Sequence, residues 1–472
     1  MKKKIIGISI IALLLIAILF ATFNSDLGVN AMEKINANYP DNIIIFDDIA
    51  EQSEGDDLPE PRVFIPPSEE SIKLTMEQVQ AFDCETVEDV PVSECEALVA
   101  LYASTNGSAW TNNTNWLQST TVGDWYGVSV TASYNGPTIL SLSGNNLVGT
   151  IPPEIENLSD LKSLILSKNF LTGYIPSGIF NLVNLLRINL SDNLLTGTIP
   201  PEFGNGDYVA INLGSNLFTG QIPAELGEAQ SLQYLNLSDN QLTGTIPAEI
   251  GQLWYLYTLN IANNKIEGVV PQSLTNLSRL RQGTDFGYNR LNVPQEEPVH
   301  SFLNTKDPDW YLTQAIQKPI PCVSGGEIIS RNGRVKIAVP AGACNGVLEL
   351  MLAPLMKPSQ AYEPMFWARN SFELSAWDER GPVTQFPKPL NFTLYYSDGG
   401  IGTAPENFLT IEMVDEEDIV WRDAVGTCPD GEYTRNFDDN WVRLPVCHLT
   451  EFGLFNHRPE TPLRLYIPMG FN

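Results

Sequence analysis

The chain has 472 residues, of which 43% are hydrophobic and 18% are charged, enough apolar side chain for about two or three folded domains. With 27 basic and 56 acidic residues, its formal net charge is −29. A surface this acidic repels phosphate groups, which argues against a nucleic-acid partner. The sequence contains no GxSxG, HExxH or phosphate-loop motif and only three histidines, so we expect no enzyme active site, no metal and no other cofactor.

The first 31 residues have the layout of an export signal. Three lysines precede an apolar run over Ile5–Phe23, and Val29 and Ala31 suit the −3 and −1 positions of a cleavage site. The run is also long enough to span a bilayer, so residues 1–31 are predicted to be a signal peptide or an N-terminal membrane anchor. Either alternative predicts an exported protein, secreted or held at the cell surface.

Residues 32–75 are expected to form an acidic, disordered linker. The stretch "DDIAEQSEGDDLPEPRVFIPP" carries many carboxylates and prolines and almost no aromatic side chain. Such a segment buries too little apolar surface to offset the entropy lost on folding.

The middle of the chain repeats with a fixed period. Asparagines recur every 23 or 24 residues, at Asn145, Asn169, Asn193, Asn216, Asn240 and Asn264. A period of this length predicts a solenoid, in which each repeat buries its apolar face only against its neighbours. We assign the repeats to residues 137–294.

The spacing within one repeat assigns roles to its residues. Leucines at alternate positions, such as Leu164 and Leu166, are predicted to point inward from a short strand. The asparagine turns the chain and hydrogen-bonds buried backbone from inside the stack. Four glycines are expected where a side chain would be forbidden, at Gly173, Gly197, Gly220 and Gly244.

The repeated text, as in "LQYLNLSDNQLTGTIP", resembles the plant-type class of leucine-rich repeat, whose signature includes the "LxGxIP" segment. The resemblance implies a right-handed superhelix of short parallel strands. A degenerate copy around Asn289 is what a terminal repeat should look like.

Both ends of the stack need covers. Residues 76–136 resemble the N-terminal cap of that family, with a helix expected over about Ser93–Ala103. Trp110, Trp116 and Trp125 are predicted to seal the open end of the stack, the alternative being a sugar-binding platform. Residues 295–321 are assigned to a C-terminal cap and linker.

A different pattern follows, over residues 322–458. Apolar and polar residues alternate between Gly, Asn and Pro turns, which predicts an all-β sandwich domain. Its start, with Gly325, Gly326 and "VPAGA" at Val339–Ala343, resembles the β-sandwich domain shared by ankyrins and netrin receptors. Residues 459–472 are left as a C-terminal tail.

Six cysteines lie outside the export signal, and an even number in an exported chain favours disulfides. Because they fall in three close pairs, nearest-neighbour bridging is predicted, as Cys84–Cys95, Cys322–Cys344 and Cys428–Cys447.

Leucine-rich repeat solenoids mostly bind partners on the concave strand face, where exposed residues alternate with the buried leucines. The resemblance therefore predicts that this chain binds an extracellular protein, peptide or glycan there. The alternative is that these are simply solvated strand residues of a structural surface component. The predicted ligand-binding residues are Arg187, Asn189, Asn212, Tyr234, Asn236, Thr258 and Asn260.

One stretch near the C-terminus, "VCHLTEFGLF", has two interpretations. It resembles the self-cleavage site of adhesion receptors, with His448 as the base and Thr450 as the nucleophile that attacks the Leu449 carbonyl. The favoured interpretation is a closing β-strand whose apolar residues pack inward.

Overall fold

The structure is a computed structural model that describes residues 66–131, 134, 136–281, 284–292 and 298–355. Beyond these it describes residues 366–367, 371–378, 380–383, 385–395, 409–415, 420–423, 428, 432–436, 441–448 and 451–456. The chain divides into two compact units. One runs to Leu242 and includes Pro247–Asn260 and Ser273–Arg281, and the other contains Thr243–Ile246, Ile261–Gln272 and the chain from Gln282 onward.

The first unit begins with a helical cap that contains α2 (Glu69–Ala81), η2 (Cys84–Thr86), α3 (Val92–Ser104), η3 (Gly107–Ala109) and η4 (Val122–Asp124). Helix α3 is the predicted cap helix, longer by one residue at each end. Helix α2 corrects the expected linker over 32–75, because residues from Glu69 onward are helical. The hydroxyl of Ser68 caps this helix by accepting the Ser71 N–H at 3.0 Å.

The three cap tryptophans are buried, so they form no sugar-binding platform. Trp116 packs against Trp110 and Trp125 with ring centroids 4.8 and 4.9 Å apart. Each indole N–H donates to a backbone carbonyl, as Trp116 does to Tyr126 at 2.9 Å. Sealing the end of the stack is therefore their role, as predicted.

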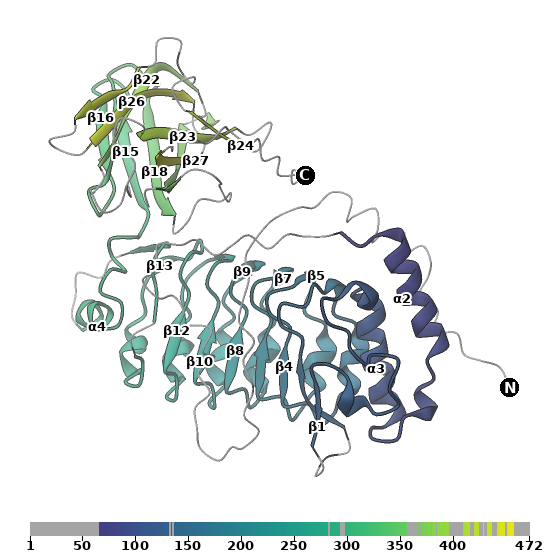
Figure 1. The fold of residues 1–472 in the computed structure, drawn as a ribbon. Helices are drawn as coiled ribbons and strands as arrows, with labels where there is room; N and C mark the ends of the chain where they lie inside the picture. The colour runs from purple at the N-terminus through teal and green to yellow at the C-terminus, as the bar shows by residue number, and fades with distance from the viewer. Residues whose placement is uncertain are drawn as a thin grey trace. The chain divides into compact units, whose positions relative to one another are not determined.

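A seven-stranded sheet lines one face of the repeats, with one short strand from each coil (Figure 1). Strand β1 (Val128–Val130) pairs antiparallel with β2, and all later pairs are parallel. The parallel strands are β2 (Pro137–Ser141), β4 (Ser163–Ile165), β6 (Arg187–Asn189), β8 (Ala210–Asn212), β10 (Tyr234–Asn236) and β12 (Thr258–Asn260).

A second sheet and a row of short 3₁₀ helices complete the coils. The second sheet contains β3 (Val148–Thr150), β5 (Phe170–Gly173), β7 (Leu194–Thr198), β9 (Leu217–Gln221) and β11 (Gln241–Thr243). The 3₁₀ helices are η5 (Pro153–Asn157), η6 (Ser177–Asn181), η7 (Pro201–Asn205), η8 (Ala224–Glu228), η9 (Ala248–Gln252) and η10 (Gln272–Asn276). The four predicted glycines have φ between 75° and 93°, so a side chain there would be strained.

The repeated asparagines bond backbone from inside the stack, as predicted. Asn169 donates from Nδ2 to the carbonyls of Leu142, Leu166 and Ser167 at 2.8–3.0 Å. Its Oδ1 accepts the Leu147 N–H at 3.0 Å. Because the same contacts recur in later coils, these side chains satisfy buried backbone that the turns leave without partners.

In the second unit, strands β13 (Glu267–Val269) and β14 (Arg290–Asn292) pair in parallel, and helix α4 (Val299–Lys306) follows. Asn289, in the degenerate copy, makes the same kind of side-chain hydrogen bonds to backbone as the repeated asparagines. One repeat after Asn289, Gln314 stands at the position of the repeated asparagine. Its Oε1 accepts the Leu291 N–H at 3.0 Å, and its Nε2 donates to the Phe286 carbonyl at 3.0 Å.

The all-β domain begins earlier than expected, because Ile316–Pro321 forms its first strand and not a linker. One sheet has eight strands, β15 (Ile316–Pro321), β18 (Val347–Leu355), β19 (Phe366–Trp367), β20 (Ser371–Asp378), β21 (Gly381–Pro382), β23 (Leu409–Asp415), β24 (Val420–Asp423) and β27 (Glu451–Asn456). The other has five, β16 (Gly326–Ile329), β17 (Val335–Val339), β22 (Gln385–Tyr395), β25 (Thr434–Asn436) and β26 (Trp441–His448).

The two sheets share one apolar core, which makes the domain a sandwich (Figure 1). Leu350 and Phe372 of the first sheet and Ile337, Phe392 and Leu444 of the second are buried in it. The rings of Phe372 and Phe392 lie 5.9 Å apart between centroids. The alternation of apolar residues in these strands therefore faces inward, as the sequence predicts.

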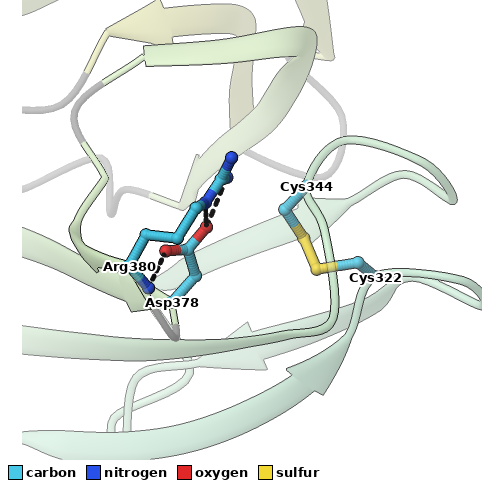
Figure 2. A network of polar contacts seen from close by, with 4 residues as sticks. All are labelled: Cys322, Cys344, Asp378 and Arg380. Carbon is cyan, nitrogen blue, oxygen red and sulfur yellow. Dashed lines mark hydrogen bonds and ion pairs between the residues drawn. A yellow bond between two sulfur atoms is a disulfide. The ribbon is translucent and has the colours of Figure 1, made fainter.

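Three disulfides are present, in the same pairs that the cysteine spacing favours: Cys84–Cys95, Cys322–Cys344 and Cys428–Cys447. Figure 2 shows the second of these, together with the ion pair between Arg380 Nη2 and Asp378 Oδ2 at 2.6 Å. Hydrogen bonds from the Arg380 side chain lower the pKa of the Asp378 carboxyl below its usual value.

Four predicted segments lie wholly or partly outside the described residues. They are the apolar run Ile5–Phe23, residues 32–65 of the expected linker, Leu449 and Thr450 of the suggested cleavage site, and the C-terminal tail 459–472. The backbone of His448 ends strand β26. Within the part of the chain that the structure describes, no helix is both long and apolar enough to cross a membrane.

Candidate ligand-binding face

The seven-stranded sheet brings all seven predicted binding residues onto one face. In the three-residue strands β4, β6, β8, β10 and β12, the middle residue, such as Ile211 or Leu235, is buried inside the coil. The two flanking residues point the other way, because successive side chains of a strand alternate. Strand register then defines two columns, Ser163–Arg187–Ala210–Tyr234–Thr258 and Ile165–Asn189–Asn212–Asn236–Asn260.

These residues are less exposed than the sequence suggests. Asn189 is 2% exposed, Asn212 6% and Tyr234 8%, so the expectation of a freely solvated row is wrong for these three. Arg187, Asn236, Thr258 and Asn260 are partly buried. The physical reason is the spacing of parallel strands, about 4.8 Å, at which neighbouring side chains of one column shield each other.

In Asn189, Asn212 and Asn236 of the asparagine column, the amide oxygen accepts a backbone hydrogen bond, and the amide nitrogen has no acceptor among the described residues. Oδ1 of Asn189 accepts the N–H of Ser191, two residues on, at 3.1 Å. Asn212 and Asn236 repeat the contact with Gly214 at 3.2 Å and with Ser238 at 3.0 Å. The carboxamide oxygen is thus used within the strand end, in the manner of an Asx turn.

The amide nitrogens of Asn189, Asn212 and Asn236 have no hydrogen-bond acceptor among the described residues. Since the strands are in register, the three NH₂ groups recur from strand to strand along the column. Backbone contacts fix the orientation of each carboxamide. The column is therefore a row of pre-oriented hydrogen-bond donors.

Arg187 adds a positive charge beside this row. Its Nε is buried and has no hydrogen-bond partner, and the side chain forms no ion pair within the described residues. A buried donor without a partner costs free energy, roughly 1–3 kcal/mol, unless a ligand supplies the acceptor. The register neighbours of Arg187 are Ser163 and Ala210, neither of which carries a carboxylate.

Small residues in strand β8 and just after it lie between the larger side chains of the neighbouring strands. Ala210 lies between Arg187 and Tyr234 in the first column. Gly214 lies beyond Asn212, and a Cβ at that position would come within 2.7 Å of Nδ2 of Asn236. A side chain at Gly214 would therefore displace one of the donors.

The described residues contain no group of three or more His, Cys, Asp or Glu side chains placed to hold a metal ion. The outward-facing side of the seven-stranded sheet, which we call the concave face, offers a set of hydrogen-bond donors next to one guanidinium and one aromatic ring. It suits reversible binding of an acceptor-rich ligand.

Sequence reasoning placed Arg187 and the asparagines on this face but missed that the amide oxygens are already used. The signal was available in part. Ser, Gly and Ser follow the three asparagines two positions on, and short residues there leave room for the side chain to turn back onto the backbone.

Five segments of the chain match a known repeat family. Residues 137–158, 160–182, 184–205, 231–253 and 255–277 match the leucine-rich repeat family. Over the matched part, the chain is 38% identical to the plant peptide hormone receptor RGFR1, solved in complex with RGF2. That match covers 32% of this chain and 24% of the receptor, with a TM-score of 0.31. The chain thus spans about a quarter of the length of that receptor.

Two Arabidopsis proteins give similar matches. The ectodomain of the receptor kinase HAESA, solved with a peptide hormone ligand, is 27% identical over 43% of this chain and 38% of its own, with a TM-score of 0.35. The BIR2 ectodomain is 26% identical over 44% of this chain and 97% of its own, with a TM-score of 0.31.

Proposed function

We propose that the chain is an extracytoplasmic recognition or adhesion protein that binds a protein, peptide or glycan on the concave face of its repeats. One observation carries the proposal. Three asparagine amides and the Arg187 side chain stand in neighbouring columns with donor groups that no described residue satisfies. Donors fixed in this way lose little entropy when a ligand binds.

The chemistry of the face selects the ligand. Carbonyl, hydroxyl and carboxylate oxygens complement a row of N–H donors, whereas an ammonium group does not. An extended peptide backbone and a glycan both present such oxygens at short, regular intervals. The Tyr234 ring in the same column as Arg187 can pack against an apolar part of either ligand.

The three disulfides support an extracytoplasmic location. Two of them, Cys84–Cys95 and Cys322–Cys344, lie in different parts of the chain, one in the N-terminal cap and one in the sandwich. Structural disulfides form and persist in oxidising compartments outside the cytosol.

Peptide and glycan arrays probed with the intact protein test the proposal. A ligand found in this way should be lost by Asn212→Asp, because the substitution preserves the acceptor for Gly214 N–H but turns the unpaired donor into a negative charge. Asn276→Asp makes the same chemical change at an exposed position on η10 and should leave binding intact.

Silence of both arrays with a folded protein would contradict the proposal, since it would leave a structural surface component as the better account. Equal binding by Asn212→Asp and the wild type would place the ligand elsewhere on the molecule.

A further inference from the structure

A second surface lies at the edge where the strands of the concave sheet begin. Tyr257 immediately precedes β12, and Tyr255 lies two residues before Tyr257. Arg279 and Arg281 hold the same two positions one repeat later. We call these four residues the Tyr–Arg ladder. Its members belong to one compact unit, and none of them is among the predicted binding residues.

The four side chains interleave. The guanidinium carbon of Arg279 lies 4.7 Å from the ring centroid of Tyr255, and that of Arg281 lies 4.6 Å from the centroid of Tyr257. Nη1 of Arg279 also donates to the Tyr257 hydroxyl at 3.3 Å. Because each arginine is held against a ring, less entropy is lost when it binds a partner.

The ladder is open to solvent. Tyr255 is 49% exposed, and the neighbouring Trp254 is 54% exposed. Both arginines are exposed as well. A tryptophan and a tyrosine exposed side by side leave apolar area in water, and such area at the surface commonly marks a contact site.

Neither arginine forms an ion pair within the described part of the chain. Acidic residues outnumber basic ones by 56 to 27, so the two neighbouring guanidinium groups are a local positive charge on a negatively charged chain. One N–H of Arg279 is used by Tyr257, and Arg281 donates no hydrogen bond to a described side chain. The remaining N–H groups suit carboxylates, which guanidinium binds through two parallel hydrogen bonds.

We propose that the Tyr–Arg ladder and Trp254 form a second docking surface, which binds an acidic peptide segment of a partner protein. Carboxylates of the segment pair with Arg279 and Arg281, and an adjacent apolar side chain covers Trp254. This surface goes beyond the proposed ligand site and does not depend on it.

The charge of the molecule favours a short peptide over a long polyanion. Two guanidinium groups neutralise only a few carboxylates, while the chain as a whole carries −29. A long anionic polysaccharide would extend past the two arginines, and the net negative charge of the chain would repel it. A peptide with two or three carboxylates around one leucine or phenylalanine ends before that happens.

Fluorescence anisotropy tests the proposal on the full chain. The probes are labelled twelve-residue peptides with three Asp or Glu residues around one Leu or Phe, and matched peptides in which Asn and Gln replace the acids. We expect the acidic peptides to bind and the amide peptides to bind at least about tenfold more weakly. Affinity should fall as salt is added, because the contacts are charged and exposed.

Variants locate the site. Arg279→Ala with Arg281→Ala should weaken binding of the acidic peptides by about tenfold or more without changing the melting temperature greatly, since both side chains are exposed. Tyr257→Phe keeps the ring and removes the hydroxyl that holds Arg279, so it should weaken binding by about two- to threefold. Arg334→Ala removes an exposed arginine from the sandwich and should have no effect.

Three results would overturn the proposal. They are no binding of any acidic peptide, equal binding of the amide peptides, and unchanged binding by the double arginine variant. Polygalacturonate could bind the wild type and not the double arginine variant, while the acidic peptides bind neither. The ligand of this surface would then be an anionic glycan and not a peptide. The double arginine variant should still bind the ligand of the concave face as the wild type does, which separates failure here from failure of the proposed ligand site.

Discussion

Replacing one buried asparagine by aspartate should destabilise the solenoid far more than the same change four residues away. Nδ2 of Asn240 donates to the carbonyls of Leu213, Leu237 and Ser238 at 3.0–3.2 Å, while Oδ1 accepts the Phe218 N–H at 3.0 Å. Asn240→Asp keeps the acceptor but sets a carboxylate oxygen against three carbonyl oxygens.

The cost follows from the hydrogen bonds that a carboxylate cannot donate. Two N–H hydrogens disappear, and each buried carbonyl left unsatisfied costs roughly 1–3 kcal/mol, so we expect Asn240→Asp to lower the free energy of unfolding by about 3–5 kcal/mol at pH 7. The deficit should shrink toward pH 4, because a protonated carboxyl regains one donor and the buried site favours the neutral form.

Asn236→Asp is the matched control in the same coil. Its Oδ1 contact with Ser238 survives the change, and its NH₂ has no described partner to lose, so the expected cost is under about 1 kcal/mol. Urea denaturation followed by circular dichroism at both pH values measures the difference. Equal costs for the two variants, or a loss under about 1 kcal/mol for Asn240→Asp, would refute the assigned roles of the two asparagine columns.

Three further predictions concern the core, the C-terminal cap and the chain's covalent integrity. Leu235→Ala removes a fully buried side chain and should cost about 2–5 kcal/mol in urea denaturation, and a near-neutral result would contradict the coil register. Burial raises the pKa of Asp307 to about 7, with Asp285 and Asp309 adding repulsion. In the unfolded chain this carboxyl loses its proton at a lower pH than in the folded protein, so the free energy of unfolding should fall as pH rises from about 4 to 7. Asp307→Asn should weaken this pH dependence. An unchanged pH dependence would contradict its assignment to Asp307. A denaturing gel should show one full-length band for both wild type and Thr450→Ala, whereas a short wild-type fragment lost in the variant would establish self-cleavage.

Much of the fold follows from the repeat period. The asparagine spacing and the alternate leucines determine the coils, because each position has one environment repeated many times. The cap helix and the burial of Trp116 are also predictable, since an open stack end requires a bulky apolar cover.

The ends of the solenoid are harder to predict because they break the repeat. Gln314 continues the asparagine ladder with a longer side chain, and no pattern in the preceding coils indicates that replacement. Helix α2 escapes prediction for another reason. Its start carries the helix signals Ser68, an N-cap, and two glutamates in the first turn. The acidic composition of the preceding stretch nevertheless predicts a disordered linker that continues through them.

The sequence predicts which residues line the candidate site but not which of their atoms are available to bind a ligand. Strand alternation places Asn189, Asn212 and Asn236 in one column. Which side of each amide remains available depends on the turn that follows the strand, and the sequence does not state that geometry. The Tyr–Arg ladder likewise joins residues one repeat apart whose side chains meet only after the coils stack.

The most direct test of the concave-face account is calorimetric binding of an array-selected ligand to wild type, Asn236→Asp and Asn276→Asp. If the unpaired donors bind the ligand, Asn236→Asp weakens affinity by about 30-fold or more, since a mispaired polar contact costs roughly 2 kcal/mol or more. Asn276→Asp then matches the wild type, and all three proteins melt within about 2 °C of each other. Equal affinity of all three proteins, or loss of binding only together with loss of folding, would contradict it.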